Sequence, residues 1–443
     1  MIEKIVNQEI PKGYKKGKHY VIPENWDDLV ISDIVRFSGG AQPPRSEFIN
    51  EPRKGYIRLI QIRDYKTDDY LTYIPIEKAR KFCDETDVMI GRYGPPIFQI
   101  LRGLEGAYNV ALMKAIPDEK RLLKEYLFYY LQNGDLYNLI DRLSRRTSGQ
   151  TGVDIEALNN FPFPLPSITE QKKILSVINT WEKAIELKEK LIEWKKERHK
   201  GLLQKLLWGH IRWNDLGKGL SKGDIEQRTK FISTGVPPKG YQKIKSFIIP
   251  DDWEFVEISK IAKQVTRLNK DNKNYVVLSC TKYKGLVDSL KYFGKQVFSS
   301  DLSKYKVVSK SEFAYATNHI EEGSIGLQKD YDYGLVSPMY TVFKTNNYIN
   351  NEFLFALLKT ENYRRIFETM MSASVDRRGS LRWNEFSKIK IPLPPNEEQE
   401  VIISILLESN KEIEYLEKEI ENLKLQRKGL LQLLLTGKLR VNV

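Results

Sequence analysis

The sequence predicts an α+β protein that contains one domain twice, with a long helix after each copy. Three observations predict this: blocks that recur at a constant spacing, the same order of elements in both halves, and a heptad pattern that ends each half. The recurring blocks lie 227 or 228 residues apart: Pro11–Tyr14 with Pro238–Tyr241, Ile22–Trp26 with Ile249–Trp253, Pro164–Gln171 with Pro392–Gln399, and Gly201–Gly209 with Gly429–Gly437. Blocks that keep one order indicate an internal duplication, and copies of about 210 residues are too large for solenoid repeats.

Each half begins with an Ile-Pro-x-x-Trp segment, in which the proline disfavours a helix and the tryptophan can fill a core. Short β-rich runs follow at 56–62 and 275–279, and helical stretches at 122–131 and 352–359, so that each domain mixes strands and helices. We therefore expect the following organisation: a first domain at 1–166, a first helix at 167–208, a linker at 209–236, a second domain at 237–394 and a second helix at 395–443.

Both helices carry apolar residues at alternating steps of three and four, the pattern of a coiled-coil core. The predicted core positions of the first helix are Ile174, Ile178, Trp181, Ile185, Ile192, Leu202 and Leu206. Those of the second helix are Ile402, Leu406, Ile413, Leu416, Ile420, Leu423, Leu430 and Leu434. Polar residues interrupt the first set, and we expect Leu187, Leu191 and Trp194 to widen it.

Charge favours pairing of the two helices with each other. Residues 170–208 hold 10 Lys and Arg against 6 Asp and Glu, whereas residues 397–440 hold 7 against 9. Because the whole chain has a net charge of +13, most of the basic surplus lies in the globular domains. A surplus of this size favours a polyanionic partner, with nucleic acid the first choice and a membrane surface the second.

Signatures of catalysis and of metal binding are not found in the sequence. There is no G-x-x-x-x-G-K-[ST] loop, and the glycine-rich stretch 217–223 is interpreted as a linker. Gly94-Pro95-Pro96 lacks the polar residue that precedes the two prolines in amino-methyltransferase motifs, so it is interpreted as a turn. The 2 cysteines and 4 histidines show no zinc-ligand spacing. We expect no catalytic residue, no metal and no cofactor in this chain, and a soluble cytoplasmic protein with no membrane partner.

The duplicated motifs resemble those of type I restriction-modification specificity subunits. The residues that carry the resemblance are Pro164–Gln171 with Gly201–Gly209 and Pro392–Gln399 with Gly429–Gly437, together with Gly55–Asp64 and Leu335–Phe343. The resemblance covers essentially the whole chain.

The resemblance implies two target recognition domains, separated by two long antiparallel coiled-coil helices in a pseudo-two-fold symmetric arrangement. Each domain would read one half of an asymmetric split site on double-stranded DNA. Two methyltransferase subunits would dock on the helices, and restriction subunits would join the assembly. S-adenosylmethionine, ATP and magnesium would belong to those partner subunits.

Candidate DNA contacts come from arginines beside small hydroxyl residues and glycine, a composition that suits phosphate and guanine edges. In the first half they are Arg92, Tyr93, Arg145, Arg146, Ser148, Gln150 and Thr151. In the second half they are Tyr315, Thr317, Asn318, His319, Arg377, Arg378, Ser380 and Arg382. An ordinary solvated basic loop remains an alternative for each position. For the whole chain, the alternative is a coiled-coil scaffold with two protein-binding domains and no DNA role.

Overall fold

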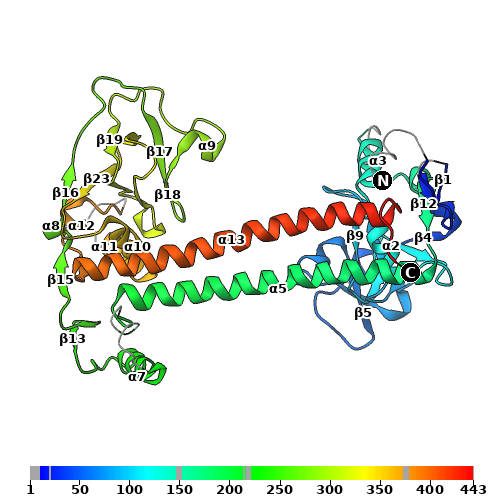
Figure 1. Ribbon diagram of the computed structural model, residues 1–443, viewed down its shortest axis with the longest axis horizontal. Coiled ribbons are helices and arrows are strands. Elements are labelled where there is room, and N and C mark those ends of the chain that lie inside the picture. Colours follow the sequence, from blue (N-terminus) through cyan, green and yellow to red (C-terminus); the bar gives the residue numbers. More distant parts are fainter. Residues whose placement is uncertain are drawn as a thin grey trace. The chain divides into compact units, whose positions relative to one another are not determined.

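The computed structural model describes residues 10–18, 21–145, 152–212, 215, 221–372 and 379–442 (Figure 1). They form two compact units. Unit 1 contains residues 1–190 and 418–443, and unit 2 contains residues 191–417. Each unit thus holds one globular domain and a part of both long helices. None of the described helices combines the length and the apolar content that crossing a lipid bilayer requires.

Unit 1 is built on two four-stranded sheets. The first has the order β4 (Val35–Gly39), β11 (Leu112–Pro117), β8 (Val88–Gly91), β9 (Gln99–Leu101), and the second has the order β6 (Tyr73–Pro75), β5 (Tyr56–Ile60), β10 (Gly106–Tyr108), β7 (Phe82–Cys83). Two antiparallel pairs complete the strands: β1 (Tyr14–Lys16) with β2 (Val21–Pro23), and β3 (Asp27–Val30) with β12 (Pro162–Leu165). The helices are α2 (Lys124–Tyr130), α3 (Gly134–Ser144) and α4 (Ile155–Asn159), with 3-10 turns η1 (Ile31–Asp33), η2 (Arg45–Glu47), η3 (Ile62–Tyr65) and η4 (Ile76–Lys78).

Unit 2 repeats this arrangement. Its sheets have the orders β16 (Ala262–Val265), β23 (Tyr340–Thr345), β20 (Phe313–Ala316), β21 (Ile325–Leu327) and β18 (Gly285–Asp288), β17 (Val276–Thr281), β22 (Tyr333–Val336), β19 (Lys306–Ser309). The antiparallel pairs are β13 (Tyr241–Ile244) with β14 (Phe247–Pro250), and β15 (Glu254–Glu257) with β24 (Lys390–Leu393). The helices are α7 (Lys222–Ser233), α8 (Ile258–Ile261), α9 (Ser289–Phe293), α10 (Asn351–Leu358), α11 (Glu361–Ser372) and α12 (Trp383–Phe386), with one 3-10 turn, η5 (Ile320–Glu322).

In both units the second sheet contains one parallel pair, β5 with β10 and β17 with β22. The predicted mixture of helices and sheets, in two repeated domains, is confirmed.

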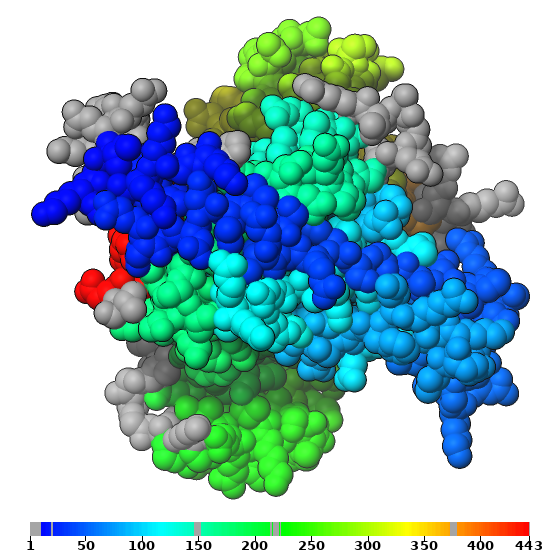
Figure 2. Space-filling view, turned by 90° about the vertical axis from the view of Figure 1, so that its right-hand side faces the viewer, coloured from blue at the N-terminus to red at the C-terminus, as the bar shows by residue number. Residues whose placement is uncertain are grey.

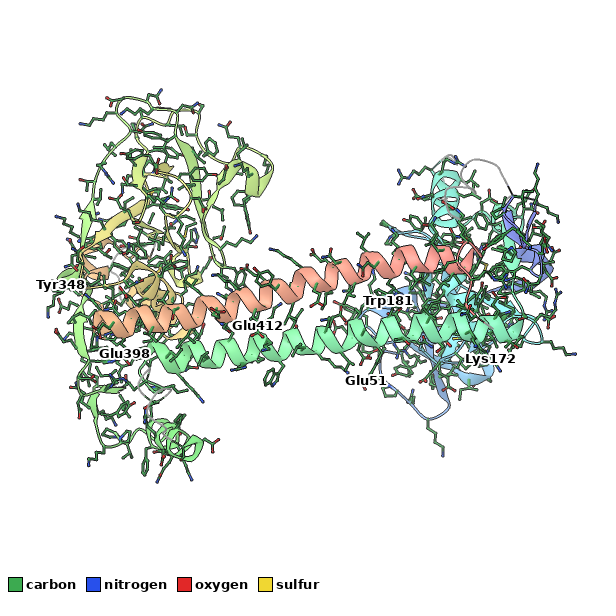
Figure 3. All side chains as sticks on the ribbon, in the orientation of Figure 1. Glu51, Lys172, Trp181, Tyr348, Glu398 and Glu412 are labelled. Carbon is green, nitrogen blue, oxygen red and sulfur yellow. The ribbon has the colours of Figure 1, made fainter. Side chains whose placement is uncertain are left out.

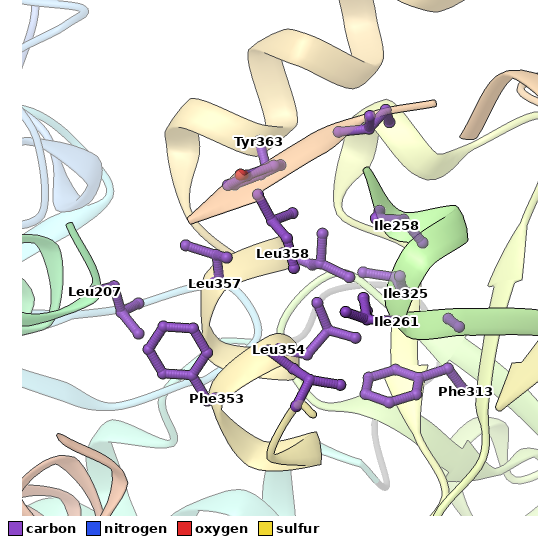
Figure 4. Close-up of a cluster of buried hydrophobic side chains, with 14 of the residues drawn as sticks. Leu207, Ile258, Ile261, Phe313, Ile325, Phe353, Leu354, Leu357, Leu358 and Tyr363 are labelled. Carbon is purple, nitrogen blue, oxygen red and sulfur yellow. The ribbon is translucent and has the colours of Figure 1, made fainter. Parts of the chain in front are cut away.

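A closely packed apolar core holds each domain together. Trp26 and Trp253, the tryptophans of the repeated entry segment, are both buried in these cores. Figure 4 shows the core of unit 2, where Phe353 and Leu357 of α10 lie close to Leu207. Burying large apolar side chains contributes about 1.5–3 kcal/mol for each, so these clusters supply much of the stability of each domain.

The long helices are α5 (Ile168–Leu207) and α13 (Asn396–Leu435), each 40 residues long. Every predicted core position on them is buried or half-buried. The expectation that Leu187, Leu191 and Trp194 widen the core of α5 is wrong, because these side chains are 54%, 38% and 58% exposed. One residue step turns a helix by about 100°. Leu187 therefore points well away from half-buried Lys188, although the two are neighbours in the sequence.

The glutamine of the repeated Glu-Gln pair hydrogen-bonds the first turn of each long helix to its domain. In unit 1, Gln171 accepts a hydrogen bond from the Leu123 amide at 3.0 Å and donates to the Arg121 carbonyl oxygen at 2.7 Å. In unit 2, Gln399 accepts from the Asn350 amide at 2.6 Å and donates to the Tyr348 carbonyl oxygen at 3.1 Å. These contacts explain why a glutamine recurs four or five residues after the prolines.

The glutamate that precedes this glutamine binds one residue from each of the two repeats. In unit 1, the fully buried Glu170 accepts hydrogen bonds from Trp26 Nε1 at 3.0 Å and from Arg440 Nε at 2.7 Å. Tyr14 donates to the Gly437 carbonyl oxygen at 3.0 Å, and Figure 2 shows red C-terminal atoms beside the blue N-terminal segment. We call Tyr14, Trp26, Glu170, Gly437 and Arg440 the first clasp.

Unit 2 contains the same set of residue types, which we call the second clasp: Tyr241, Trp253, Glu398, Gly209 and Arg212. Glu398, in the first turn of α13 (Figure 3), accepts from Trp253 Nε1 at 2.9 Å and from Arg212 Nε at 2.6 Å. Tyr241 donates to the Gly209 carbonyl oxygen at 2.6 Å.

The two clasp glycines meet the domains at close range. A Cβ atom on Gly209 would lie 2.6 Å from Pro250 Cδ, and one on Gly437 would lie 2.6 Å from Pro23 Cδ. Both glycines also have a positive φ, +67° and +71°, a conformation that other residues rarely adopt. In both clasps the tyrosine, tryptophan and glutamate come from one repeat, and the glycine and arginine come from the other.

The second clasp yields a stability prediction. Replacing Arg212→Met leaves the Glu398 carboxylate buried without its cation, so we expect the free energy of unfolding to fall by about 3–5 kcal/mol. Adding Glu398→Gln removes the unpaired charge and should recover part of that loss. Denaturant unfolding of the two single variants and the double variant measures this coupling. A loss below about 1 kcal/mol in the arginine variant would contradict the role of the clasp.

Candidate nucleic-acid interface

The predicted contact residues gather where two loops of each domain meet. In unit 1, the Val153 amide donates to the Arg92 carbonyl oxygen at 3.1 Å, which joins the segment before α4 to the turn after β8. In unit 2, the Leu381 amide donates to the Thr317 carbonyl oxygen at 2.8 Å, which joins the segment before α12 to the turn after β20. Residues far apart in the sequence are thus brought together in the same way in both domains.

Part of the predicted set lies outside the described residues: Arg146, Ser148, Gln150, Thr151, Arg377 and Arg378. The described segments begin again at Gly152 and Gly379, directly after these loops. A Cβ atom on Gly152 would lie 3.4 Å from the Tyr93 ring, so Gly152 lies beside Tyr93.

In unit 1 the described candidates present cations and an aromatic ring to solvent. The Arg92 guanidinium lies 5.4 Å from the Tyr93 ring centroid, and its Nη1 donates to the Val110 carbonyl oxygen at 3.4 Å. Tyr93 is exposed, and Arg145 at the end of α3 pairs with Asp141 at 2.8 Å. An arginine held against an aromatic ring loses less freedom when it binds a phosphate or a base edge.

In unit 2 the exposed candidates are His319 and Arg382, while Asn318 and Ser380 are half-buried. His319 Nδ1 lies 3.4 Å from Glu322 Oε1 on the same turn. Within the described residues, His319, Glu321 and Glu322 form a group of possible metal ligands, with ligand atoms within 4.8 Å of one another. The group lies on an exposed turn, where acidic side chains are common without an ion.

Two predicted contacts in unit 2 are wrong. Tyr315 is 0% exposed and its ring stacks on Phe386 with centroids 4.6 Å apart. Thr317 is buried, and its hydroxyl donates to the Met339 carbonyl oxygen at 2.9 Å. All four residues of β20 are buried, so neither face of this strand is open to a ligand. The sequence missed this because an alternating Phe-Ala-Tyr-Ala pattern is also typical of a strand with one open face.

The described thiols and one histidine are poorly suited to catalysis. Burial raises the pKa of the Cys83 thiol to about 11 and that of Cys280 to about 12, so both stay protonated at neutral pH. Burial lowers the pKa of His210 to about 4, so its imidazole is neutral. None of these three described groups is therefore an activated nucleophile.

Sequence reasoning missed one group of exposed residues in each domain. In unit 2 the tip of the β17–β18 hairpin consists of Lys282, Tyr283 and Lys284, all exposed. In unit 1 the connection from β5 to β6 carries Arg63 and the exposed Tyr70. A Lys-Tyr-Lys-Gly tip between two β-rich runs is a detectable signal, because basic and aromatic residues at a hairpin tip suit nucleic-acid contacts.

Two copies of one mixed domain, each exposing cationic and aromatic loop residues, define a duplicated recognition protein with a basic surface. The family described as "Type I restriction modification DNA specificity domain" matches residues 23–194 and 250–425. The chain therefore belongs to this family, and it is a specificity subunit of a type I restriction-modification system with two DNA recognition domains.

Relatives and solved structures agree with this family. The chain is 25% identical over 447 residues to the type I restriction enzyme MjaVIII specificity subunit of Methanocaldococcus jannaschii, covering 97% of this chain and 96% of that protein. It is 24% identical over 456 residues to the MjaX specificity subunit of the same organism, covering 97% of each.

A solved chain from work on complex assembly and conformational transition of the type I R-M system has a TM-score of 0.57 at 14% identity, covering 95% of this chain and all of that one. The HsdS subunit from Thermoanaerobacter tengcongensis has a TM-score of 0.51 at 14% identity, covering 96% and 100%. These structures share the fold. The alternative of a scaffold without a DNA role does not fit this family.

The contrast between His319 and Tyr315 gives a prediction. His319→Ala removes an exposed side chain at the loop junction, and we expect duplex affinity to fall by about 1–3 kcal/mol, the contribution of one base contact. Tyr315→Phe removes a buried hydroxyl that has no hydrogen-bond partner among the described residues, so it should leave the methylated site unchanged with little change in stability. Duplex binding and methylation-site sequencing of both variants measure this. A changed site in the Tyr315 variant alone would reverse the assignment.

Proposed function

We propose that this chain reads an asymmetric DNA site in two parts, one with each domain, and performs no catalysis itself. The observation that carries the proposal is that two domains with one strand order present different side chains at the equivalent loop junction. Arg92 and Tyr93 occupy it in unit 1, and Thr317 and Asn318, followed by the exposed His319, occupy it in unit 2. Because direct readout depends on the side chains that reach base edges, different side chains on equal scaffolds favour two different half-sites.

We further propose that α5 and α13 form an antiparallel coiled-coil spacer. Within unit 1, Lys188 pairs with Glu419 at 2.8 Å, Glu189 with Lys424 at 2.6 Å, and Glu182 with Arg427. These contacts support an antiparallel pair, because Glu182, the earliest of the three in α5, pairs with the latest of the three residues in α13.

The contacts within unit 2 also support an antiparallel pair. Lys195 pairs with Glu412, labelled on α13 in Figure 3, at 2.6 Å, and Lys196 pairs with Glu417 at 2.7 Å. His199 Nδ1 lies 3.0 Å from the Ser409 hydroxyl. The opposite net charges of the two helices support the same pairing. Exchange of residues between the repeats at both clasps supports a pseudo-two-fold arrangement.

Methyltransferase subunits are the partners that we propose for the exposed faces of α5. In unit 1 a groove of about 830 Å³ lies between α2 and α5, lined by Leu123, Leu175, Asn179, Ala184 and Leu187 among others. In unit 2 the exposed Trp194 lies on α5. Exposed apolar side chains beside charged ones suit a protein interface. We assign S-adenosylmethionine, ATP and magnesium to the partner subunits, and we propose that restriction subunits join through them.

Division of labour between subunits is the first consequence to test. We expect the purified chain with S-adenosylmethionine to leave DNA unmethylated, and the same chain with its methyltransferase subunit to methylate one split site. Genomic methylation mapping with and without the gene reports the site and the function together. Methylation by the purified chain alone would overturn the proposal, and so would a methylation map that does not change when the gene is removed.

The spacer can be tested at neighbouring positions of α13. Leu416→Asp with Ile420→Asp places two carboxylates at predicted core positions, where burial of an unpaired charge costs several kcal/mol. We expect recognition of the split site to be lost while each domain stays folded. Tyr415→Asp is the matched control, because Tyr415 is exposed one residue away. Equal methylation by the double variant and the control would show that the helices do not set the spacing.

A further inference from the structure

We propose that the tip of the β17–β18 hairpin, Lys282, Tyr283 and Lys284, binds the phosphate backbone of duplex DNA beside the Asn318–His319 turn. The inference rests on the proposed function and extends it to residues outside the predicted contact set. It also assigns Lys359 as the residue that positions this tip.

The tip offers two cations that are not neutralised by nearby carboxylates. Tyr283 is 83% exposed, and Lys282 and Lys284 are exposed as well. The Lys282 ammonium lies 5.3 Å from the Tyr283 ring centroid, and the Lys284 ammonium lies 5.9 Å from that of Tyr292 on α9. Within the described part of the chain neither lysine has an ion pair. Both ammonium groups are therefore oriented by aromatic rings and keep their charge for an external anion.

Lys359, just after α10, ties this tip to the predicted contact loop. Its ammonium donates to the carbonyl oxygens of Lys282 at 2.6 Å and Gly323 at 2.7 Å, with Thr281 at 3.3 Å and Ile325 at 3.4 Å. Gly323 follows η5, which begins directly after His319. The hairpin tip and the turn that carries Asn318 and His319 are thus held by one ammonium group.

The backbone below the tip is packed closely enough to fix this arrangement. A Cβ atom on Gly326 would lie 2.4 Å from the Leu286 amide nitrogen and 2.9 Å from the Gly285 carbonyl carbon, so β18 and β21 approach through glycine. Burial lowers the pKa of Lys359, and the carbonyl oxygens around its ammonium replace the water that burial removes. A half-buried lysine that is hydrogen-bonded to two surface turns fixes their position relative to each other.

Unit 1 has a similar pair at the equivalent connection. The Arg63 guanidinium on η3 lies 5.6 Å from the ring centroid of Tyr70, which is 64% exposed, and its Nη2 donates to the Tyr70 carbonyl oxygen at 3.1 Å. A Cβ atom on Gly91 would lie 3.2 Å from Ile62 Cδ1, which brings η3 to the turn of Arg92 and Tyr93. A cation stacked on an exposed tyrosine thus recurs beside the contact loop, although the two connections differ in sequence and length.

Duplex DNA fits this surface better than a protein does. Residues 281–297 hold four lysines and one aspartate, and phosphate oxygens accept hydrogen bonds from lysine ammonium and tyrosine hydroxyl groups alike. The tip is polar and cationic, whereas the centre of a protein interface is poor in lysine. Phosphate contacts at the tip would fix the orientation of the domain while the neighbouring turn reaches the bases.

The experiment uses the chain assembled with its methyltransferase subunit and a duplex that carries the site found by methylation mapping. Affinity is measured over a sodium chloride series. Each lost phosphate contact reduces the slope of log affinity against log salt by about 0.9, so Lys282→Gln with Lys284→Gln should reduce it by about 2. Tyr283→Phe should weaken binding about tenfold, as expected for one hydrogen bond to a charged group. Lys260→Gln is the control, because this exposed lysine on α8 already pairs with Glu254 at 2.6 Å, and it should change neither quantity.

Lys359 is tested separately, because its loss also removes internal hydrogen bonds. Lys359→Met should reduce the salt slope although the side chain does not touch DNA, and Lys359→Arg should restore it. Thermal unfolding of both variants separates a displaced tip from an unfolded domain. A purely structural role for Lys359 would lower stability and leave the salt slope of the folded protein unchanged, which would contradict the positioning role.

The outcomes distinguish this inference from the proposed function. A wild-type assembly that does not bind or methylate the duplex refutes the proposed function itself. A wild-type assembly that methylates the site while the hairpin variants keep its affinity and salt slope refutes the inference alone. Hairpin variants that lose the methyltransferase subunit on co-purification, with an unchanged salt slope, would assign the tip to a protein partner and also overturn the inference.

Discussion

A buried carboxylate that takes its cation from the other repeat is the constraint on which this fold depends. Glu170 is bound by Trp26 of its own repeat and by Arg440, 270 residues away, and Glu398 is bound by Trp253 and by Arg212, 186 residues away. Leaving either carboxylate buried and unpaired would be costly, so both arginines must reach the domain of the other repeat. Each long helix therefore begins at the clasp glutamate of one unit and leads to the clasp arginine of the other. The repeats cannot be completed separately, and this makes a duplicated chain one protein.

The clasps leave the recognition surfaces free to differ. The tyrosine, tryptophan, glutamate, glycine and arginine of each clasp lie where a long helix meets its domain, while the candidate contacts lie on loops after β8 and β20 and before α4 and α12. Loops on a rigid scaffold can change without unfolding it. The Lys359 ammonium stabilises the loops in a second way. It donates to backbone carbonyl oxygens of two turns, so the side chains of those turns can change without loss of the contact. A protein that recognises a DNA sequence needs this combination of a rigid scaffold and loops that can change.

The sequence predicted the parts of this structure that depend on periodicity and repetition. The two mixed domains and the long helices follow from the block spacing and from the apolar steps of three and four. Tyr315, Thr317 and Leu187 were misplaced because a pattern in one chain does not show which face of a strand or helix another element covers. Arg212 and Arg440 recur 228 residues apart and could have been noticed, but their partners Glu398 and Glu170 become apparent only in the fold. The hydrogen bonds of the Lys359 ammonium could not have been predicted, because its partners are carbonyl oxygens, which every residue has.

The two clasps also show where the repeats have diverged. Arg212 binds Asp252 through both Nη atoms at 2.8 Å in addition to Glu398, whereas the position that corresponds to Asp252 in the first repeat is Asn25. Among the described residues, two carboxylates bind the arginine of the second clasp and one binds the arginine of the first. Hydrogen bonds to charged groups contribute more to stability than neutral ones, so we expect the second clasp to be the more stable of the two. Divergence is thus tolerated even at the junctions, provided that the buried glutamate keeps its arginine. The same freedom, applied to exposed loops that carry no such obligation, allows the two repeats to present different side chains on one scaffold.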